Sequence, residues 1–294
     1  MKIRYLSIIC IVYLLIAVGC KVTHHPKVVA THGDKPNKAI NYKTYRSAKG
    51  FNSRIHFLVM HYTACNFERS IKLLTQGGVS AHYLVPDISD STFIARGYKE
   101  QEIFNLVDEQ DRAWHAGVSS WGSRTNLNDT SIGIEIVNTA TEKDSIFYFP
   151  AFHPEQIKAV KNLATHVLSR YPDIKPIHII GHSDIAWDRK TDPGPQFPWH
   201  DLYLAGIGAW FDDETKNCYA EEYACNGLPT QDTILNLLSK YGYNTSLATT
   251  DISYQLLVRA FQLHFYPQKY DGVMDIETAA RLTALVTKYF PAKG

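Results

Sequence analysis

The amino-acid sequence predicts an α/β fold with a mixed central sheet flanked by helices, followed by a small C-terminal bundle of three helices. Between residues 46 and 211, short apolar runs typical of buried strands alternate with segments of helical periodicity. From residue 228 onward, apolar residues recur at helical spacing alone. The length of 294 residues and the hydrophobic content of 45% are sufficient for two domains.

The first twenty residues have the features of a secretory signal. Lys2 and Arg4 precede an apolar run over residues 6–18, which is too short to span a bilayer. Gly19-Cys20 resembles the processing site of bacterial lipoproteins, although Ala17 stands where leucine is usual. We therefore expect residues 1–20 to be a lipoprotein signal and Cys20 to become the lipidated first residue. The alternative is an ordinary cleaved signal.

Residues 21–45 contain lysine, histidine, threonine and proline without an apolar period. Such a composition is typical of a flexible tether. Signal and tether together predict an exported protein that is held to a membrane through its N-terminus. The formal net charge of +1 gives no electrostatic basis for binding nucleic acid.

The first predicted strand covers the apolar run Phe57-Leu58-Val59-Met60 and ends at His61. Residues 66–76 then predict a helix, which Gly77-Gly78 ends. Two further strands are predicted over residues 80–85 and 92–95. A histidine at the end of a buried strand makes His61 a candidate metal ligand.

The strand predicted over residues 131–137 carries a carboxylate among isoleucines. Its two faces alternate, with Ile132, Ile134 and Ile136 on one face and Ser131, Gly133 and Glu135 on the other. A carboxylate on a packed apolar face would be costly, and glycine leaves space beside it. We interpret Glu135 as facing a wet, polar site. The alternative is a surface glutamate on a solvent-exposed sheet face.

A long helix is predicted to begin at His153-Pro154, because proline favours the first helical position. Its core-facing stripe consists of Ile157, Val160, Ala164 and Leu168. The apolar run that follows ends at His182. The order of strand, helix, strands, helix and strand supports the predicted sheet with helices on its faces.

The segment after His182 contains the second group of candidate ligands. Asp192 opens an Asp-Pro-Gly-Pro turn ten residues later, and the prolines restrict the backbone just after it. Its carboxylate could therefore share a cation with a strand-end histidine. In an extended segment Lys190 would point to the same side as Asp192. The alternative is an ordinary strand-end histidine and an aspartate that merely begins a turn.

Trp114-His115-Ala116-Gly117 is a compact turn suited to the wall of a substrate groove. We expect Trp114, His115 and His82 to contact the substrate. For both histidines the alternative is a structural, hydrogen-bonded role.

The C-terminal region is predicted to be a separate domain over residues 228–294, joined by a linker over residues 212–227. Its three helices are indicated by the apolar spacing around Ile234, Ala260 and Leu282. In an oxidising compartment Cys218 and Cys225 could pair across the linker and leave Cys65 free, but the sequence does not settle this.

Four motifs, quoted in chain order, resemble a known family over residues 50–211: His61-Tyr62-Thr63, Trp114-His115-Ala116-Gly117, Ser131-Ile132-Gly133-Ile134-Glu135, and His182 to Pro195 with Arg189-Lys190 and Asp192. The family is that of the zinc-dependent N-acetylmuramoyl-L-alanine amidases, related to phage lysozyme-like amidases and peptidoglycan recognition proteins. The C-terminal region is similar to three-helix peptidoglycan-binding modules, with a ligand-free packing appendage as the alternative.

The resemblance implies that His61, His182 and Asp192 hold Zn²⁺, with Glu135 and Lys190 as catalytic residues. Asp184 is a rival ligand, which we assign to orienting the site. The implied substrate is peptidoglycan or muropeptides, cut between N-acetylmuramic acid and L-alanine. Lipoprotein members of the family imply anchoring to the outer membrane, facing the periplasm. The alternatives are a zinc peptidase that cuts within the stem peptide and a peptidoglycan-binding protein without activity.

Overall fold

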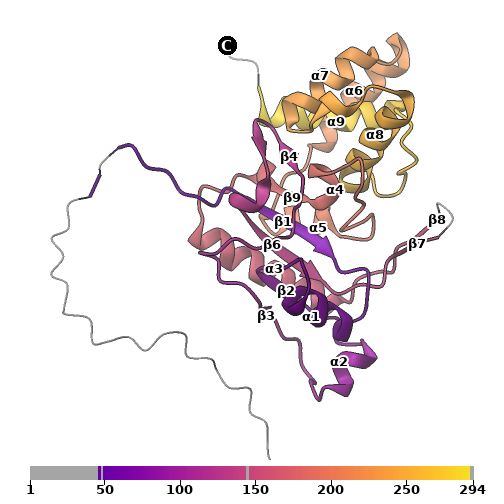
Figure 1. Cartoon of the computed structure of the whole chain (residues 1–294). Coiled ribbons are helices and arrows are strands. Elements are labelled where there is room, and N and C mark those ends of the chain that lie inside the picture. Colours follow the sequence, from indigo (N-terminus) through magenta and orange to yellow (C-terminus); the bar gives the residue numbers. More distant parts are fainter. Residues whose placement is uncertain (1–45, 48, 144–145, 292–294) are drawn as a thin grey trace, which may run out of the picture. The chain divides into compact units, whose positions relative to one another are not determined.

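A five-stranded sheet with strand order β3-β2-β6-β1-β9 lies at the centre of the fold (Figure 1). Strands β2 (Tyr83–Val85), β6 (Ser131–Ile136), β1 (Phe57–Tyr62) and β9 (Ile179–Gly181) run parallel, and β3 (Phe104–Asn105) is antiparallel at one edge. This mixed sheet confirms the predicted fold class. The computed structural model describes residues 46, 47, 49–143 and 146–291, so the predicted signal, tether and Cys20 lie outside the described residues.

The register of the parallel strands brings the candidate site residues to one edge of the sheet. His61 of β1 pairs with Glu135 of β6, and β9 on the other side of β1 ends just before His182. Parallel strands end at the same edge, where ligand sites form in α/β proteins. Three segments far apart in sequence therefore meet there.

Two helices are capped as their sequences indicate. In α1 (Phe67–Gln76), the side chain of Asn66 accepts a hydrogen bond from the Arg69 amide. In α3 (Pro154–Arg170), His153 is the N-cap and Pro154 is the first helical residue. The buried face of α3 packs on the isoleucine face of β6. The opposite face of β6, which carries Glu135, is therefore turned toward the candidate site.

Residues 92–95 form part of a short helix, α2 (Ser91–Ala95), and not the strand that the sequence predicted. The carboxylate of Asp90 accepts hydrogen bonds from the Thr92 and Phe93 amides, which starts a helical turn. Phe93 is fully buried in the edge-to-face contact with Phe67. Local capping therefore outweighs the β propensity of this stretch.

The remaining small elements connect the larger ones. Two antiparallel pairs lie outside the sheet: β4 (Ser120–Trp121) with β5 (Arg124–Thr125), and β7 (Thr141–Lys143) with β8 (Ile146–Tyr148). The short helices are η1 (Leu127–Asp129), η2 (Pro176–His178), α4 (His182–Ile185), α5 (Trp199–Leu204) and η3 (Thr245–Leu247). Within the described part of the chain, none of the helices has the length and apolar character needed to cross a membrane.

The predicted C-terminal helices are present as α7 (Gln231–Tyr241), α8 (Asp251–Phe265) and α9 (Ile276–Tyr289). The expected linker instead forms a further helix, α6 (Asp213–Asn226), whose buried Tyr223 hydroxyl lies 2.9 Å from Thr283 Oγ1 of α9. Cys218 and Cys225 are both free. They are two helical turns apart on α6, about 10.5 Å along its axis, which is too far for a disulfide.

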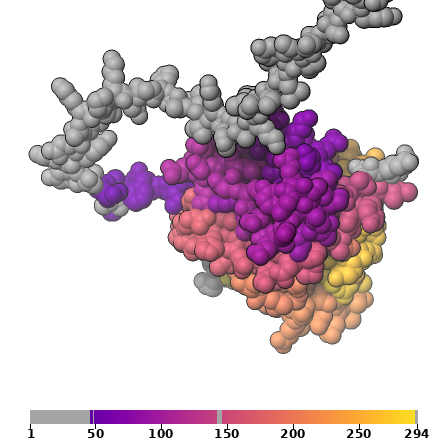
Figure 2. All heavy atoms as spheres, turned by 90° about the horizontal axis from the view of Figure 1, so that it is seen from below, coloured from indigo at the N-terminus to yellow at the C-terminus, as the bar shows by residue number. Residues whose placement is uncertain are grey.

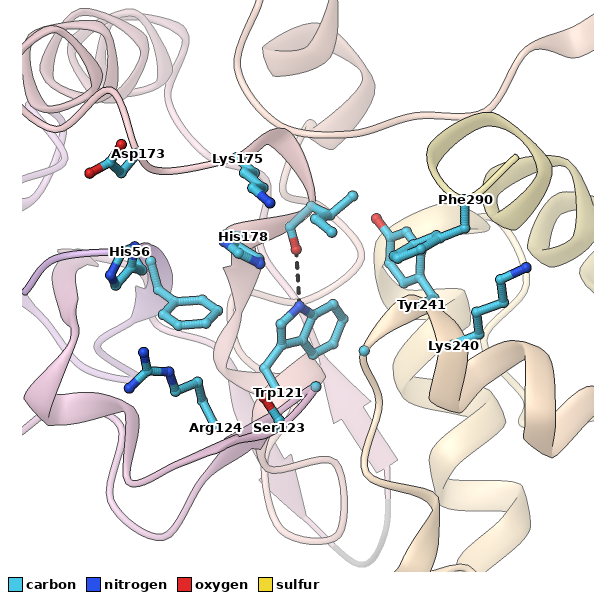
Figure 3. Close-up of a pocket in the computed structure, with 14 residues that line it drawn as sticks. His56, Trp121, Ser123, Arg124, Asp173, Lys175, His178, Lys240, Tyr241 and Phe290 are labelled. Carbon is cyan, nitrogen blue, oxygen red and sulfur yellow. Dashed lines mark hydrogen bonds between the residues drawn. The ribbon is translucent and has the colours of Figure 1, made fainter. Parts of the chain in front are cut away.

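The C-terminal helices share their hydrophobic core with the sheet. Phe57, Val59 and Ile180 of the sheet belong to one buried cluster together with residues of the C-terminal region, among them Tyr241, Tyr243, Leu257 and Phe261. A cavity of about 600 Å³ lies on this seam, with Trp121 on one side and Tyr241 and Phe290 on the other (Figure 3). Residues 51–291 thus form one packed unit, and the wall-binding role of its C-terminal helices stays a prediction.

The C-terminal helices lie at one end of this unit and α1 and α2 at the other (Figure 1). Viewed from below, the segment from α1 to β3, coloured indigo to magenta, makes up much of the visible surface (Figure 2). The candidate site lies between these two ends, at the edge of the sheet.

Candidate metal centre and active site

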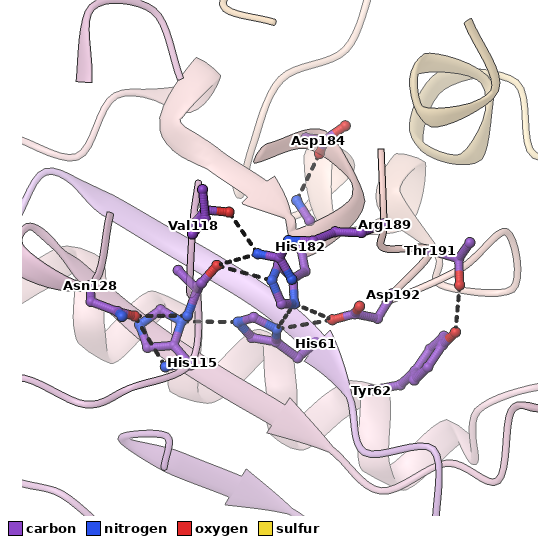
Figure 4. A network of polar contacts seen from close by, with 12 residues as sticks. His61, Tyr62, His115, Val118, Asn128, His182, Asp184, Arg189, Thr191 and Asp192 are labelled. Carbon is purple, nitrogen blue, oxygen red and sulfur yellow. Dashed lines mark hydrogen bonds and ion pairs between the residues drawn. The ribbon is translucent and has the colours of Figure 1, made fainter. Parts of the chain in front are cut away.

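His61, His182 and Asp192 converge as the sequence predicted (Figure 4). The Nδ1 atoms of His61 and His182 are 3.0 Å apart, and Asp192 Oδ2 lies 2.9 Å from the first and 3.1 Å from the second. All three side chains are buried. Three potential ligand atoms therefore surround one point.

The backbone holds the two later ligands together. His182 begins α4 directly after β9, and the Ser183 amide donates a hydrogen bond of 2.8 Å to the Asp192 carbonyl. The peptide bond between Asp192 and Pro193 is cis. Gly181 is required here because a Cβ atom would lie 2.7 Å from Pro193 Cδ. The stiff turn predicted from its prolines thus packs against the first residues of α4.

A chain of hydrogen bonds fixes the tautomer of His61. Ser131 Oγ has one proton, which it donates to the Leu127 carbonyl at 2.6 Å. Ser131 Oγ must therefore accept a hydrogen bond from His115 Nε2–H at 3.1 Å. Since the His115 proton is then on Nε2, its Nδ1 accepts from His61 Nε2–H at 3.0 Å. The lone pair of His61 Nδ1 consequently points toward His182 and Asp192.

His182 is fixed in the same way, because its Nε2 donates to the Ala116 carbonyl at 3.2 Å. Its Nδ1 lone pair therefore faces that of His61, with the Asp192 carboxylate beside both. Three electron-pair donors turned toward one another at about 3 Å repel unless a cation lies among them. The donor set therefore fits a divalent metal ion.

The electrostatics of the pocket favour the metal-binding forms of these side chains. Burial lowers the pKa of His61 to about 4, although the adjacent Asp192 carboxylate opposes this. Burial alone would raise the pKa of Asp192, but the adjacent His182 and His61 imidazoles lower it well below its usual range. Neutral imidazoles and an ionised carboxylate are the forms that coordinate metals.

Glu135 and Lys190 line the same cavity of about 220 Å³ as His182 and Asp192. Burial and the nearby Asp192 carboxylate raise the pKa of Glu135 well above its usual value, and the charge of Lys190 partly opposes this. Among the described residues, Glu135 Oε2 has no hydrogen-bond partner although it is buried. A polar atom held unpaired in a cavity is suited to a water molecule or a substrate group.

The three predicted substrate contacts differ in position. Trp114 and His115 line the cavity, and the Trp114 side chain is 61% exposed. His82 does not line it: it is fully buried, accepts from the Gly133 amide at Nδ1, and lies 3.3 Å from the Asp111 carbonyl through Nε2. His82 therefore has a structural role in this fold, and the prediction that it contacts the substrate is corrected.

The space beside Gly133, which the sequence suggested to be open, is occupied by the ring of His115. A Cβ atom at this position would lie 2.4 Å from His115 Cγ. Glycine is needed so that the His115 ring can cross the strand and reach His61. His115 therefore lines the cavity and also orients the candidate ligand His61.

Two residues hold the Trp114–Gly117 turn in place, and the sequence indicated this role for neither of them. Asn128 Oδ1 accepts from the amides of His115 and Ala116 at 3.1 and 2.7 Å. Arg189 donates to the carbonyls of Ala116 and Val118 at 3.1 and 2.6 Å. Both side chains bind backbone atoms of the loop, and such contacts leave no periodic pattern in the sequence.

Comparisons with known proteins agree with this site. A family model described as N-acetylmuramoyl-L-alanine amidase matches residues 51–195. The N-acetylmuramoyl-L-alanine amidase AmiD of Escherichia coli is 43% identical over 247 residues, which cover 84% of this chain and 87% of AmiD. The match to AmiD extends well beyond the four motifs.

Two solved structures share the fold. AmpDh3 of Pseudomonas aeruginosa, in complex with an anhydromuramic pentapeptide, has 52% identity and a TM-score of 0.83, covering 85% of this chain and 98% of AmpDh3. AmiD of E. coli, in complex with the substrate anhydro-N-acetylmuramic acid-L-Ala-D-γ-Glu-L-Lys, has 42% identity and a TM-score of 0.74, covering 83% and 93%. The resemblance stated from four motifs is thereby confirmed, and this chain belongs to the N-acetylmuramoyl-L-alanine amidase family of enzymes.

Proposed function

We propose that this amidase is zinc-dependent and cleaves the amide between N-acetylmuramic acid and L-alanine in peptidoglycan or muropeptides. The observation that carries the proposal is the convergence of three ligand atoms at a cavity that His182 and Asp192 line together with Glu135, whose buried Oε2 has no hydrogen-bond partner among the described residues. The anhydro-muropeptides bound by the two related structures support the same substrate class.

The donor set of two imidazoles and one carboxylate suits zinc in a catalytic site with an open position. When bound there, zinc would polarise the scissile carbonyl and lower the pKa of a bound water. His61, His182 and Asp192 would hold it, and His115 and the Ala116 carbonyl orient the two histidines.

The chain's own side chains would then move the proton and stabilise charge. Glu135 accepts a proton from the attacking water and returns it to the leaving amine, a role for which its raised pKa is suited. Lys190 faces the same cavity and stabilises the developing oxyanion. Trp114 at the exposed wall contacts the substrate.

Mass spectrometry of digested muropeptides with and without a chelator tests this function. We expect free peptides that begin with L-alanine and sugars without peptide, and we expect both to disappear when zinc is removed. Shortened stems still attached to muramic acid would indicate a zinc peptidase instead. Unchanged muropeptides would indicate a binding protein.

We also propose that Cys20 is lipidated and anchors the mature protein to the outer membrane, facing the periplasm. The sequence supports this through the apolar run that ends at Gly19-Cys20 before a polar segment. Each buried lipid methylene adds about 0.8 kcal/mol, and two or more chains hold stably. Cys20→Ala should therefore move the protein from the membrane fraction to the soluble fraction on fractionation.

Cys10→Ala is the matched control, because it removes a cysteine within the signal and should leave the protein in the membrane fraction. If Cys20→Ala remains in the membrane fraction as the control does, the lipid anchor is wrong.

A further inference from the structure

A buried polar cluster lies where the sheet meets the C-terminal helices, close to the ligands but outside the cavity. The carboxylate of Asp184, fully buried, accepts hydrogen bonds from the Gly181 amide at 2.7 Å, from His264 Nδ1 at 2.8 Å and from the Tyr243 hydroxyl at 2.6 Å. Two of these three donors belong to the C-terminal region. We call Asp184, Tyr243 and His264 the seam cluster.

Packing leaves the seam cluster little freedom to rearrange. The His264 ring is stacked on Trp199 at 3.8 Å and on Phe265 at 3.9 Å between centroids. His264 and Tyr243 are 3% and 2% exposed. A buried carboxylate that loses a donor cannot recover one from water, so both donors matter for where Asp184 lies.

Asp184 is connected to both the second and the third candidate ligand. It lies in α4, which begins with His182, and its Oδ2 binds the amide just before that residue. The next amide in α4, that of Ser183, binds the Asp192 carbonyl. A displacement of Asp184 would therefore shift His182 and Asp192 relative to His61, which lies on the separate strand β1.

A second bond attaches the same segment to the C-terminal region. Trp187 Nε1 donates to the Asn244 carbonyl at 2.9 Å, next to Tyr243. The segment that carries His182 and Asp192 is thus held from the C-terminal side at two points, Asp184 and Trp187.

We infer that Tyr243 and His264 are positioning residues of the metal site, so that the C-terminal helices complete the catalytic unit in addition to any role in wall binding. The inference rests on the proposed zinc function. Partners that orient metal ligands typically contribute 10–100-fold to metal affinity or activity, and we expect an effect of about this size from the seam cluster.

The test uses the full chain and compares two variants that each remove one buried tyrosine hydroxyl. Tyr243→Phe breaks the bond to Asp184, whereas Tyr223→Phe breaks the bond to Thr283 between α6 and α9 and does not touch α4. We expect Tyr243→Phe to bind zinc about 10-fold or more weakly in chelator competition and to cleave with lower kcat at similar KM. Tyr223→Phe should match the wild type in both.

His264 provides a rescue within the same experiment. His264→Ala removes the donor to Asp184 and should weaken zinc binding, whereas His264→Asn keeps an N–H donor near the Nδ1 position and should restore much of it. Equal zinc affinity in Tyr243→Phe and wild type would overturn the inference, and so would equal losses in Tyr243→Phe and Tyr223→Phe. A wild type that binds zinc but leaves muropeptides intact would overturn the proposed function alone.

Discussion

Replacing Glu135 by glutamine is expected to lower the rate of amide cleavage by about 10²–10⁴-fold, the usual contribution of a general acid–base group. Glutamine preserves the size of the side chain but cannot take the proton of a water molecule. The expected loss lies mainly in kcat, since Glu135 lines the cavity beside the candidate ligands and its proposed role is proton transfer, while other cavity residues are proposed to bind the substrate. Steady-state kinetics on a purified muropeptide measures it.

Zinc content separates this role from that of a ligand. Glu135 does not belong to the group whose ligand atoms converge, so Glu135→Gln should retain zinc in the wild-type ratio. Glu109→Gln is the control, because Glu109 pairs with Arg170 and is not among the residues lining the cavity. It should cleave at the wild-type rate. A zinc-free Glu135→Gln protein would make Glu135 a ligand and overturn the assignment.

The metal ligands could be predicted from sequence because each follows a strong local signal. His61 ends an apolar run, His182 follows another, and the prolines after Asp192 mark a stiff turn. Parallel pairing then brings the two strand ends together without further information. Glu135 could be predicted as well, since it is the single carboxylate in a strand whose other face consists of isoleucines.

Asp184 was assigned to orienting the site from sequence, but its partners and the other orienting residues could not be predicted, because their contacts join positions without a local pattern. The bond from His264 to Asp184 spans 80 residues and that from Arg189 to Ala116 spans 73. The place of His115 over Gly133 depends on the path of a loop across a strand. Such contacts are set by tertiary packing, which composition and periodicity do not encode.

The boundaries of the C-terminal region could not be predicted from sequence either. Residues 212–227 are polar and mostly exposed, which is typical of a linker, yet they form α6. Its few buried contacts, centred on Tyr223, lie on α9, more than fifty residues later. The apolar stripe of α9 was visible in sequence, but nothing showed that α6 would cover part of it.

Replacing Asp192 by alanine should remove both the zinc and the activity, in contrast to the loss of activity alone in Glu135→Gln. Asp192 supplies the only carboxylate among the three converging ligand atoms, and the other two are imidazole nitrogens. Without it, the site keeps only two protein ligands and no negative charge, one ligand fewer than catalytic zinc sites have. We expect zinc content near zero after purification and muropeptide cleavage near background.

Asp188→Ala is the matched control, because Asp188 is an exposed aspartate on the same segment, four residues before Asp192. It should retain zinc and activity at the wild-type level, which excludes a general effect of removing a carboxylate there. Metal analysis of both purified variants, beside the cleavage assay and a measurement of the folded fraction, decides the outcome. Since Asp192 is buried and its replacement could affect folding, only folded protein enters the comparison. A folded Asp192→Ala protein with full zinc and full activity would remove the third ligand and, with it, the proposed role of the Asp-Pro-Gly-Pro turn.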